Sequence, residues 1–175
     1  MYIELTNYQK LITMEFNVLA ILVAAIVPLI LRFLWYNSVL FGNVWMRESG
    51  ITEEKLKSGN MVVIFGVSLL LSILLASFTQ TLVIHQIGAT QMIGGDPTID
   101  GILPSYQAFM EDYGTNFRTF KHGALHGFLA GVFIVLPVMA TNGMFARQSW
   151  KHILINVGYW TVCLTIMGAI LCGWV

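Results

Sequence analysis

Four long runs of apolar residues alternate with polar links along the chain, over residues 17–36, 61–84, 121–144 and 151–174. A helix needs about 20 mainly apolar residues to cross the hydrocarbon core of a bilayer, because lipid offers the backbone no hydrogen-bond partners. Each run reaches that length. The pattern therefore predicts an all-α fold, an integral membrane four-helix bundle that forms one transmembrane domain over residues 1–175.

The links between the runs are polar, and two of them predict short interfacial helices. In the first link, Thr52 stands in position to cap a helix, with Glu53 and Glu54 in the first turn, where the helix dipole favours acidic side chains. The longest link covers about residues 85–116, and after Pro104 its apolar residues recur with helical spacing. These residues are Tyr106, Phe109, Met110 and Tyr113. The spacing predicts an amphipathic helix on the membrane surface.

Composition and charge restrict the class of function. Only 10% of the residues are charged and 57% are hydrophobic, against about 25% and 45–50% in ordinary soluble domains. Nine basic and nine acidic residues cancel, so no basic field is available to hold nucleic acid. The two shorter links carry Arg47, Lys55, Lys57, Arg147 and Lys151, whereas the other side carries Lys10, Arg118 and Lys121. The positive-inside rule then places both termini and the 85–116 link outside the cytoplasm, in what we expect to be a bacterial cytoplasmic membrane.

Small residues form stripes on the predicted spans. Gly123, Gly127 and Gly131 follow one another at i+4 on the third span, and Gly158 and Gly168 belong to a similar stripe on the fourth. Such stripes let helix backbones approach closely in lipid. They predict helix packing, either within one chain or between copies in a homo-oligomer.

Motifs spread along the chain are similar to those of one family. They are Leu34-Trp35-Tyr36, Leu40-Phe41-Gly42, Trp45-Met46, Gly59-Asn60-Met61, His122-Gly123, His126-Gly127, Pro137, Thr141-Asn142, Ser149-Trp150-Lys151, Asn156, Gly158-Tyr159 and Met167-Gly168-Ala169. Together they resemble an uncharacterised family of small membrane proteins, the domain of unknown function 1761, from about residue 17 onward. The family pattern has Ser-Pro after Trp-Tyr, whereas this chain has Asn37-Ser38. The resemblance implies a four-span membrane protein and brings no established activity.

Three histidines are the candidate metal ligands. His122 and His126 stand at i and i+4 on one helix face, where two imidazoles can share a metal ion, and His85 is expected at the same level of the membrane. A carboxylate of the long link would complete a tetrahedral site, the candidates being Asp96, Asp100, Glu111 and Asp112. A haem with His85 and His126 as axial ligands is an alternative. The simplest interpretation is that these side chains hydrogen-bond one another and water near the interface.

A few polar residues fall within or beside the apolar runs. Arg32 continues the stripe of Ala20, Ala24 and Pro28 at i+4, which turns it toward the other helices. The sequence favours an interfacial anchor that pairs with lipid phosphate or with Glu48 over a substrate contact, because Arg32 is near the end of its span. Asn142 and Asn156, like Gln80, are expected to form interhelical hydrogen bonds rather than contact a substrate.

The first function hypothesis is therefore a noncatalytic membrane protein, a structural or accessory subunit of a larger complex or a homo-oligomer. The sequence shows no hydrolase, zinc-protease or phosphate-binding motif, and no acidic residue falls inside a predicted span. The second hypothesis is a channel or permease for an uncoupled solute or ion. The third is a metal- or haem-binding membrane protein that uses the histidines. No cofactor is required by the sequence, and the lipid bilayer is the one certain partner of such a chain.

Overall fold

A computed structural model describes residues 17–96 and 101–174, so the predictions that involve Lys10 and Asp100 lie outside the described residues. The helices, in chain order, are α2 (Val18–Trp35), α3 (Gly42–Ser49), α4 (Glu53–Lys57), α5 (Met61–Val83), α6 (His85–Met92), α7 (Pro104–Tyr113), α8 (Phe120–Ala130), the π-helical η1 (Gly131–Val135), α9 (Leu136–Phe145) and α10 (Trp150–Gly173). The described residues contain no strand. The all-α prediction is confirmed.

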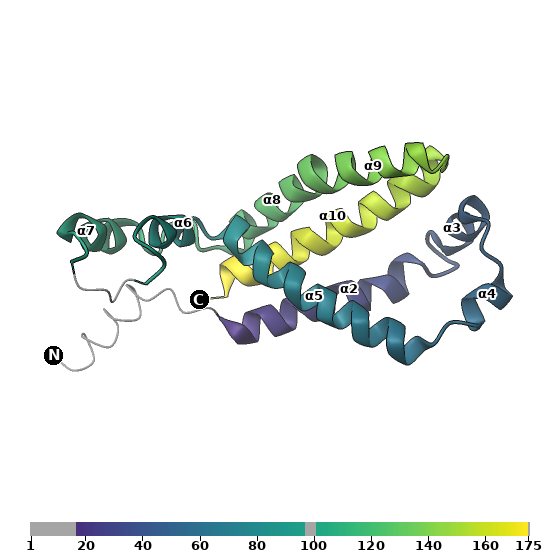
Figure 1. Ribbon diagram of the computed structural model, residues 1–175, viewed down its shortest axis with the longest axis horizontal. Coiled ribbons are helices and arrows are strands. Elements are labelled where there is room, and N and C mark those ends of the chain that lie inside the picture. The colour runs from purple at the N-terminus through teal and green to yellow at the C-terminus, as the bar shows by residue number, and fades with distance from the viewer. Residues whose placement is uncertain (1–16, 97–100, 175) are drawn as a thin grey trace.

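Within the described part of the chain, four helical segments are long and apolar enough to cross a membrane. They are α2, α5, the continuous segment Phe120–Phe145 that joins α8, η1 and α9, and α10. Their bounds lie within a few residues of the predicted runs, because the length of each run is dictated by the thickness of the hydrocarbon core. The connecting helices extend beyond the ends of the spans, α3 and α4 at one end and α6 and α7 at the other (Figure 1).

The last span, α10, packs against each of the other three. Helices α8 and α9 run alongside it, and α2 and α5 contact it from other sides (Figure 1). Its side chains Cys163, Met167 and Leu171 are fully buried and form part of the main core together with residues of α2 and α5. The core sits around α10, and α5 is the least buried of the four spans.

Glycines bring α8 into backbone contact with α10. A Cβ at Gly123 would overlap the carbonyl of Gly168, and a Cβ at Gly127 would overlap the carbonyl of Leu164. Gly131 packs in the same way on the side chain of Thr161. The small-residue faces of these two spans therefore pack on each other within one chain, so these glycines are not available to contact a second copy.

The fourth-span glycines contact different helices. Gly168 faces Gly123, whereas Gly158 faces the Trp35 ring of α2, whose Cζ2 lies 3.1 Å from the place where a Cβ would stand. One stripe on α10 thus serves two neighbours, α8 near its C-terminal end and α2 in its N-terminal half.

The short helices of the links follow the local sequence. The Thr52 hydroxyl accepts a hydrogen bond from the Lys55 amide at 3.3 Å, which confirms the cap of α4. The predicted amphipathic helix is α7, in which Tyr106 and Met110 are buried while Phe109 and Tyr113 are exposed. The Tyr106 hydroxyl lies 3.0 Å from the Thr90 hydroxyl of α6. Helix α6 itself was not predicted, and α7 uses part of its apolar face to pack on it.

Candidate metal centre

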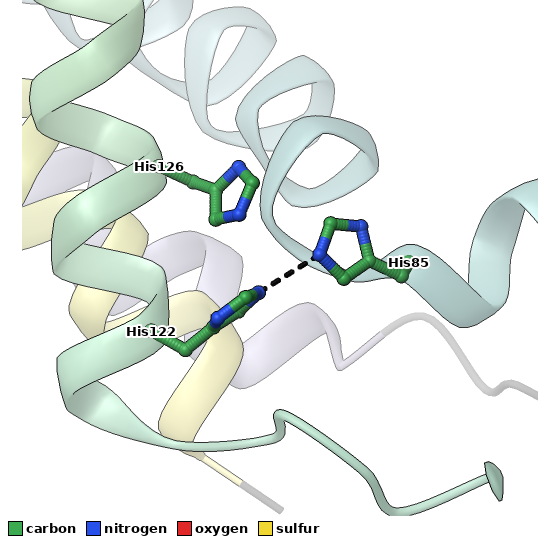
Figure 2. Close-up of side chains that lie close together, drawn as sticks. All are labelled: His85, His122 and His126. Carbon is green, nitrogen blue, oxygen red and sulfur yellow. Dashed lines mark hydrogen bonds between the residues drawn. The ribbon is translucent and has the colours of Figure 1, made fainter.

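Three histidine side chains from two helices meet at the end of the spans where α6 begins (Figure 2). His85 is the first residue of α6, while His122 and His126 lie one turn apart on α8. One ring nitrogen from each residue lies within 4.8 Å of the other two. The closest pair is Nε2 of His122 and Nε2 of His85, at 2.9 Å. Two neutral imidazoles at that distance share one proton, since one nitrogen must donate and the other accept.

The sequence His-Gly-Ala-Leu-His-Gly explains why two of these rings point the same way. Gly123 and Gly127 face α10, and each follows a histidine directly. Neighbouring residues are about 100° apart around a helix, so both histidines lie at the same edge of the α8–α10 contact. The Thr119 hydroxyl caps α8 by accepting from the His122 amide at 3.1 Å. The glycine contacts with α10 and the Thr119 cap together fix the backbone that carries the two rings.

His85 reaches the pair because the chain changes direction between α5 and α6. Ile84 has an extended backbone and a buried side chain, and α6 begins at the next residue. The following side chain, Gln86, is also buried, and its Nε2 donates to the carbonyls of Tyr113 and Asn116 at 3.0 and 2.8 Å. These bonds attach the start of α6 to the segment that leads into α8.

Phe117 covers the histidines from that segment. Its backbone is in the left-handed region at φ 63°, which is unusual for a residue with a Cβ. Its ring centroid lies 6.2 Å from that of His85 and 5.1 Å from that of His122. Its carbonyl accepts from the Thr119 amide at 2.8 Å and from Cys172 Sγ at 3.3 Å. Phe117 therefore links the histidine cluster to the end of α10, through its ring on one side and its carbonyl on the other.

The ring spacing is suited to a single metal ion. In a tetrahedral zinc site with bonds of about 2.0–2.1 Å, ligand nitrogens are about 3.3 Å apart. Pairs at 2.9 Å and within 4.8 Å need only small side-chain rotations to reach that distance. His85 is exposed and the other two rings are partly buried, so a fourth coordination position would face water.

The same spacing argues against a haem between the rings. The ring centroids lie 4.8 Å apart for His85 and His126, and His122 is 4.9 and 4.4 Å from them. A porphyrin must lie between its two axial ligands, and these contacting rings leave no gap for its plane. The carboxylates proposed to complete the site do not join the group either: within the described part of the chain, its members are the three histidines, without Asp96, Glu111 or Asp112.

The remaining sequence candidates lie elsewhere. Arg32 has an exposed side chain, and its guanidinium carbon lies 5.2 Å from the centroid of the Tyr36 ring. Asn156 forms the expected interhelical bond, with its Oδ1 accepting from the Tyr36 hydroxyl at 2.7 Å. Asn142 is exposed on α9, and Gln80 is buried with its Oε1 lacking a partner among the described residues. None of these side chains contributes to the histidine cluster.

Sequence reasoning did not find Gln86 or Phe117. Neither residue has periodicity or charge that distinguishes it, and each acts through contacts between segments about 30 residues apart. The signal that does exist is local: Gln86 directly follows a candidate ligand, and Phe117 lies just ahead of the Thr119 cap. Only the folded structure shows that Gln86 bonds to the Tyr113 and Asn116 carbonyls and that Phe117 contacts His85.

Comparisons with known proteins agree with the architecture. No curated protein and no solved structure matches the chain. A family model described as "Protein of unknown function (DUF1761)" matches residues 19–172, which include all four span-capable segments nearly in full and the three histidines. The chain therefore belongs to the DUF1761 family.

Proposed function

We propose that this protein binds one divalent transition-metal ion, of which zinc is the best fit, through His85, His122 and His126. The observation that carries the proposal is the convergence of three ring nitrogens within 4.8 Å from two separate helices. The hydrogen bond between His85 and His122 accounts for that pair alone, whereas His126 also brings a ring nitrogen into the same group. Three imidazoles with one open position are a recurring ligand set for zinc.

The donor type supports this class of ion. Imidazole nitrogen suits Zn²⁺, Cu²⁺ and Ni²⁺, whereas Mg²⁺ and Ca²⁺ require oxygen ligands. The two cysteines are buried and are not members of the group. The exposure of His85 supports exchange of the ion with water at the membrane surface rather than a closed structural site. We propose a binding role without catalysis, since the sequence shows no hydrolase, zinc-protease or phosphate-binding motif.

The channel hypothesis receives less support. The small-residue faces that a solute path would use pack backbone against backbone between α8 and α10. The inward face of α10 is filled by apolar side chains such as Met167 and Leu171, which are fully buried.

Assembly into a homo-oligomer or a larger membrane complex remains part of the proposal. Its support is α5, the least buried span. The exposed large apolar side chains of α5 are Met61, Val62, Val63, Ile64, Val67, Leu69, Leu70, Leu71, Leu74 and Phe78. Gly66 lies among them with open space around it, a position where another helix can approach closely. The mass of the native particle after mild detergent extraction tests this point, and a monodisperse particle with the mass of one chain contradicts it.

Metal analysis of the purified protein tests the metal proposal. After saturation with Zn²⁺ and removal of excess, we expect one zinc per chain, and substitution by Co²⁺ should give the visible absorption bands of a tetrahedral centre. His85→Ala removes an exposed ligand and should weaken zinc binding by at least about 100-fold, more than the loss typical of second-shell changes. His126→Ala should have a similar effect.

The matched control is His152→Ala. His152 lies in the first turn of α10, at the opposite end of the span, where it stacks on Trp45 with ring centroids 6.2 Å apart. Its removal should leave zinc stoichiometry and affinity unchanged. Substoichiometric zinc in the wild-type protein, or equal losses in His152→Ala and His85→Ala, contradicts the proposal.

A further inference from the structure

Arg32 carries a positive charge at the end of a membrane span, and no acidic side chain among residues 17–96 and 101–174 forms an ion pair with it. In the part of the chain that the structure describes, no carboxylate oxygen lies within 4.0 Å of its guanidinium. Glu48, which the sequence suggested as a partner, instead accepts hydrogen bonds from Arg47 and from the Ser149 hydroxyl. A charge on a membrane span is costly unless another group neutralises it.

The stripe to which Arg32 belongs shows where its side chain goes. Ala20, Ala24 and Pro28 are buried at successive i+4 positions, yet Arg32, next in the series, is exposed. The difference arises because a long side chain can leave a buried backbone position and bring its charged group to the surface. The guanidinium ends beside the Tyr36 ring at the end of α2.

The surface below the guanidinium is built from anchored aromatic side chains. The Tyr36 hydroxyl donates to Asn156 Oδ1 at 2.7 Å, and Trp35 Nε1 donates to the Ile155 carbonyl at 3.0 Å. The Tyr36 ring also contacts that of Tyr159, with centroids 5.3 Å apart. Because Tyr36 is held by α10, its cation–π contact restricts Arg32 while leaving the outer donors of the guanidinium open.

The surrounding charge favours an anionic ligand at this end. The described residues here comprise six basic side chains, Arg32, Arg47, Lys55, Lys57, Arg147 and Lys151, and three acidic ones, Glu48, Glu53 and Glu54. Glu48 pairs with Arg47 and Glu53 with Lys57, so the acids are largely engaged by other cations. Guanidinium groups bind phosphate oxygens with two parallel hydrogen bonds.

We propose that Arg32 binds the phosphate of an anionic phospholipid, whose acyl chains lie along the apolar surface of α2 and α5. That surface includes Phe33, which is exposed and stacks on Phe65 of α5 with centroids 5.6 Å apart. A guanidinium beside an exposed apolar surface suits a ligand that carries both a phosphate and acyl chains, which favours a lipid over a soluble anion. This site is independent of the histidine cluster.

Titration of the detergent-extracted protein with phosphatidylglycerol or phosphatidylcholine, followed by native mass spectrometry, tests the site. The wild-type protein should bind phosphatidylglycerol about tenfold more tightly than phosphatidylcholine, and Arg32→Gln should lose most of that preference. The control Lys151→Gln removes one positive charge from the same end, so it should change the affinity by no more than about twofold. Arg32→Lys, which keeps the charge but not the paired donors, should fall between the wild type and Arg32→Gln.

The other outcomes overturn the proposal in separate ways. Equal losses in Lys151→Gln and Arg32→Gln indicate diffuse attraction by the basic surface rather than a site. Equal binding of the two lipids by the wild type removes the anionic preference. Displacement of the lipid by inorganic phosphate at equal concentration shows a soluble-anion site. If Arg32→Gln unfolds, Arg32→Lys decides the question, because unchanged lipid selectivity in that variant contradicts paired phosphate recognition.

Discussion

The two ends of α10 are held to their neighbours by different means. Near the histidines, α8 meets α10 by direct backbone contact at Gly123 and Gly127. At the opposite end, α2 meets α10 through large aromatic side chains, Trp35 and Tyr36, which reach across to hydrogen-bond it. The first contact has no side chain to adjust, whereas the second is made of groups that can be removed one at a time.

This difference matters for what each end can do. Backbone contact fixes α8 against α10. His122 and His126 lie at the edge of that contact, where their rings stand beside His85. At the other end the contact is made by side chains, and Arg32 rests on the Tyr36 ring of that contact, where its guanidinium is exposed to an external ligand. A metal centre therefore suits the first end and a lipid contact the second.

The largest effect is expected from Gly127→Ala. The new Cβ would overlap the backbone carbonyl of Leu164, so the helices must separate, at a cost of about 3 kcal/mol in the free energy of unfolding. His126 would move with them, and zinc affinity should fall as well. The matched control is Gly88→Ala on α6, where a Cβ meets nothing within 4 Å and the change should stabilise the helix by roughly 0.5–1 kcal/mol. Chemical denaturation in detergent compares the two variants, and equal stability contradicts the backbone contact.

The next effect concerns the attachment of α6. Gln86→Leu removes two hydrogen bonds, which should cost about 1–3 kcal/mol, because the Asn116 carbonyl loses its donor while the Tyr113 carbonyl keeps the Asn116 amide. Because His85 is the preceding residue, zinc affinity should also fall, by about 10–100-fold. Gln91→Leu, on the same helix but exposed, serves as the control and should keep wild-type affinity in a calorimetric titration. An unchanged zinc affinity in Gln86→Leu would show that the hydrogen bonds of Gln86 do not position His85.

The contrast between the two ends also explains how much was predictable from sequence. The spans follow directly from runs of about 20 apolar residues, and the shared face of His122 and His126 follows from i+4 spacing. The position of His85 depends on a turn at Ile84 and on α6, which has no strong apolar periodicity. A spacing argument locates backbones rather than the ends of long side chains, which is why it placed Arg32 toward the other helices while its guanidinium is exposed.

A smaller effect is expected at the aromatic end, from Tyr36→Phe. The variant loses the hydrogen bond to Asn156 but keeps the ring below Arg32, so unfolding should become easier by about 1 kcal/mol. Lipid selectivity should be unchanged, because the cation–π contact involves the ring rather than the hydroxyl. Asn156→Ala and the double variant complete a thermodynamic cycle. If the two single effects simply add, the hydrogen bond contributes nothing to stability.

The smallest effect concerns Glu48, which ties α3 to the start of α10. Hydrogen bonds from the Ser149 hydroxyl and from Arg47 lower the pKa of the Glu48 carboxyl below its ordinary value. A carboxyl whose pKa is lower in the folded state stabilises that state above the unfolded pKa of about 4.3, and the contribution is lost as the pH falls through the folded pKa. Glu48→Gln should therefore melt slightly below the wild type at pH 7, and the gap should close as the pH falls below about 4. Glu54→Gln removes a neighbouring exposed charge of α4 as a control. A gap that stays constant across this pH range would show that the Glu48 charge does not help to hold α3 on α10.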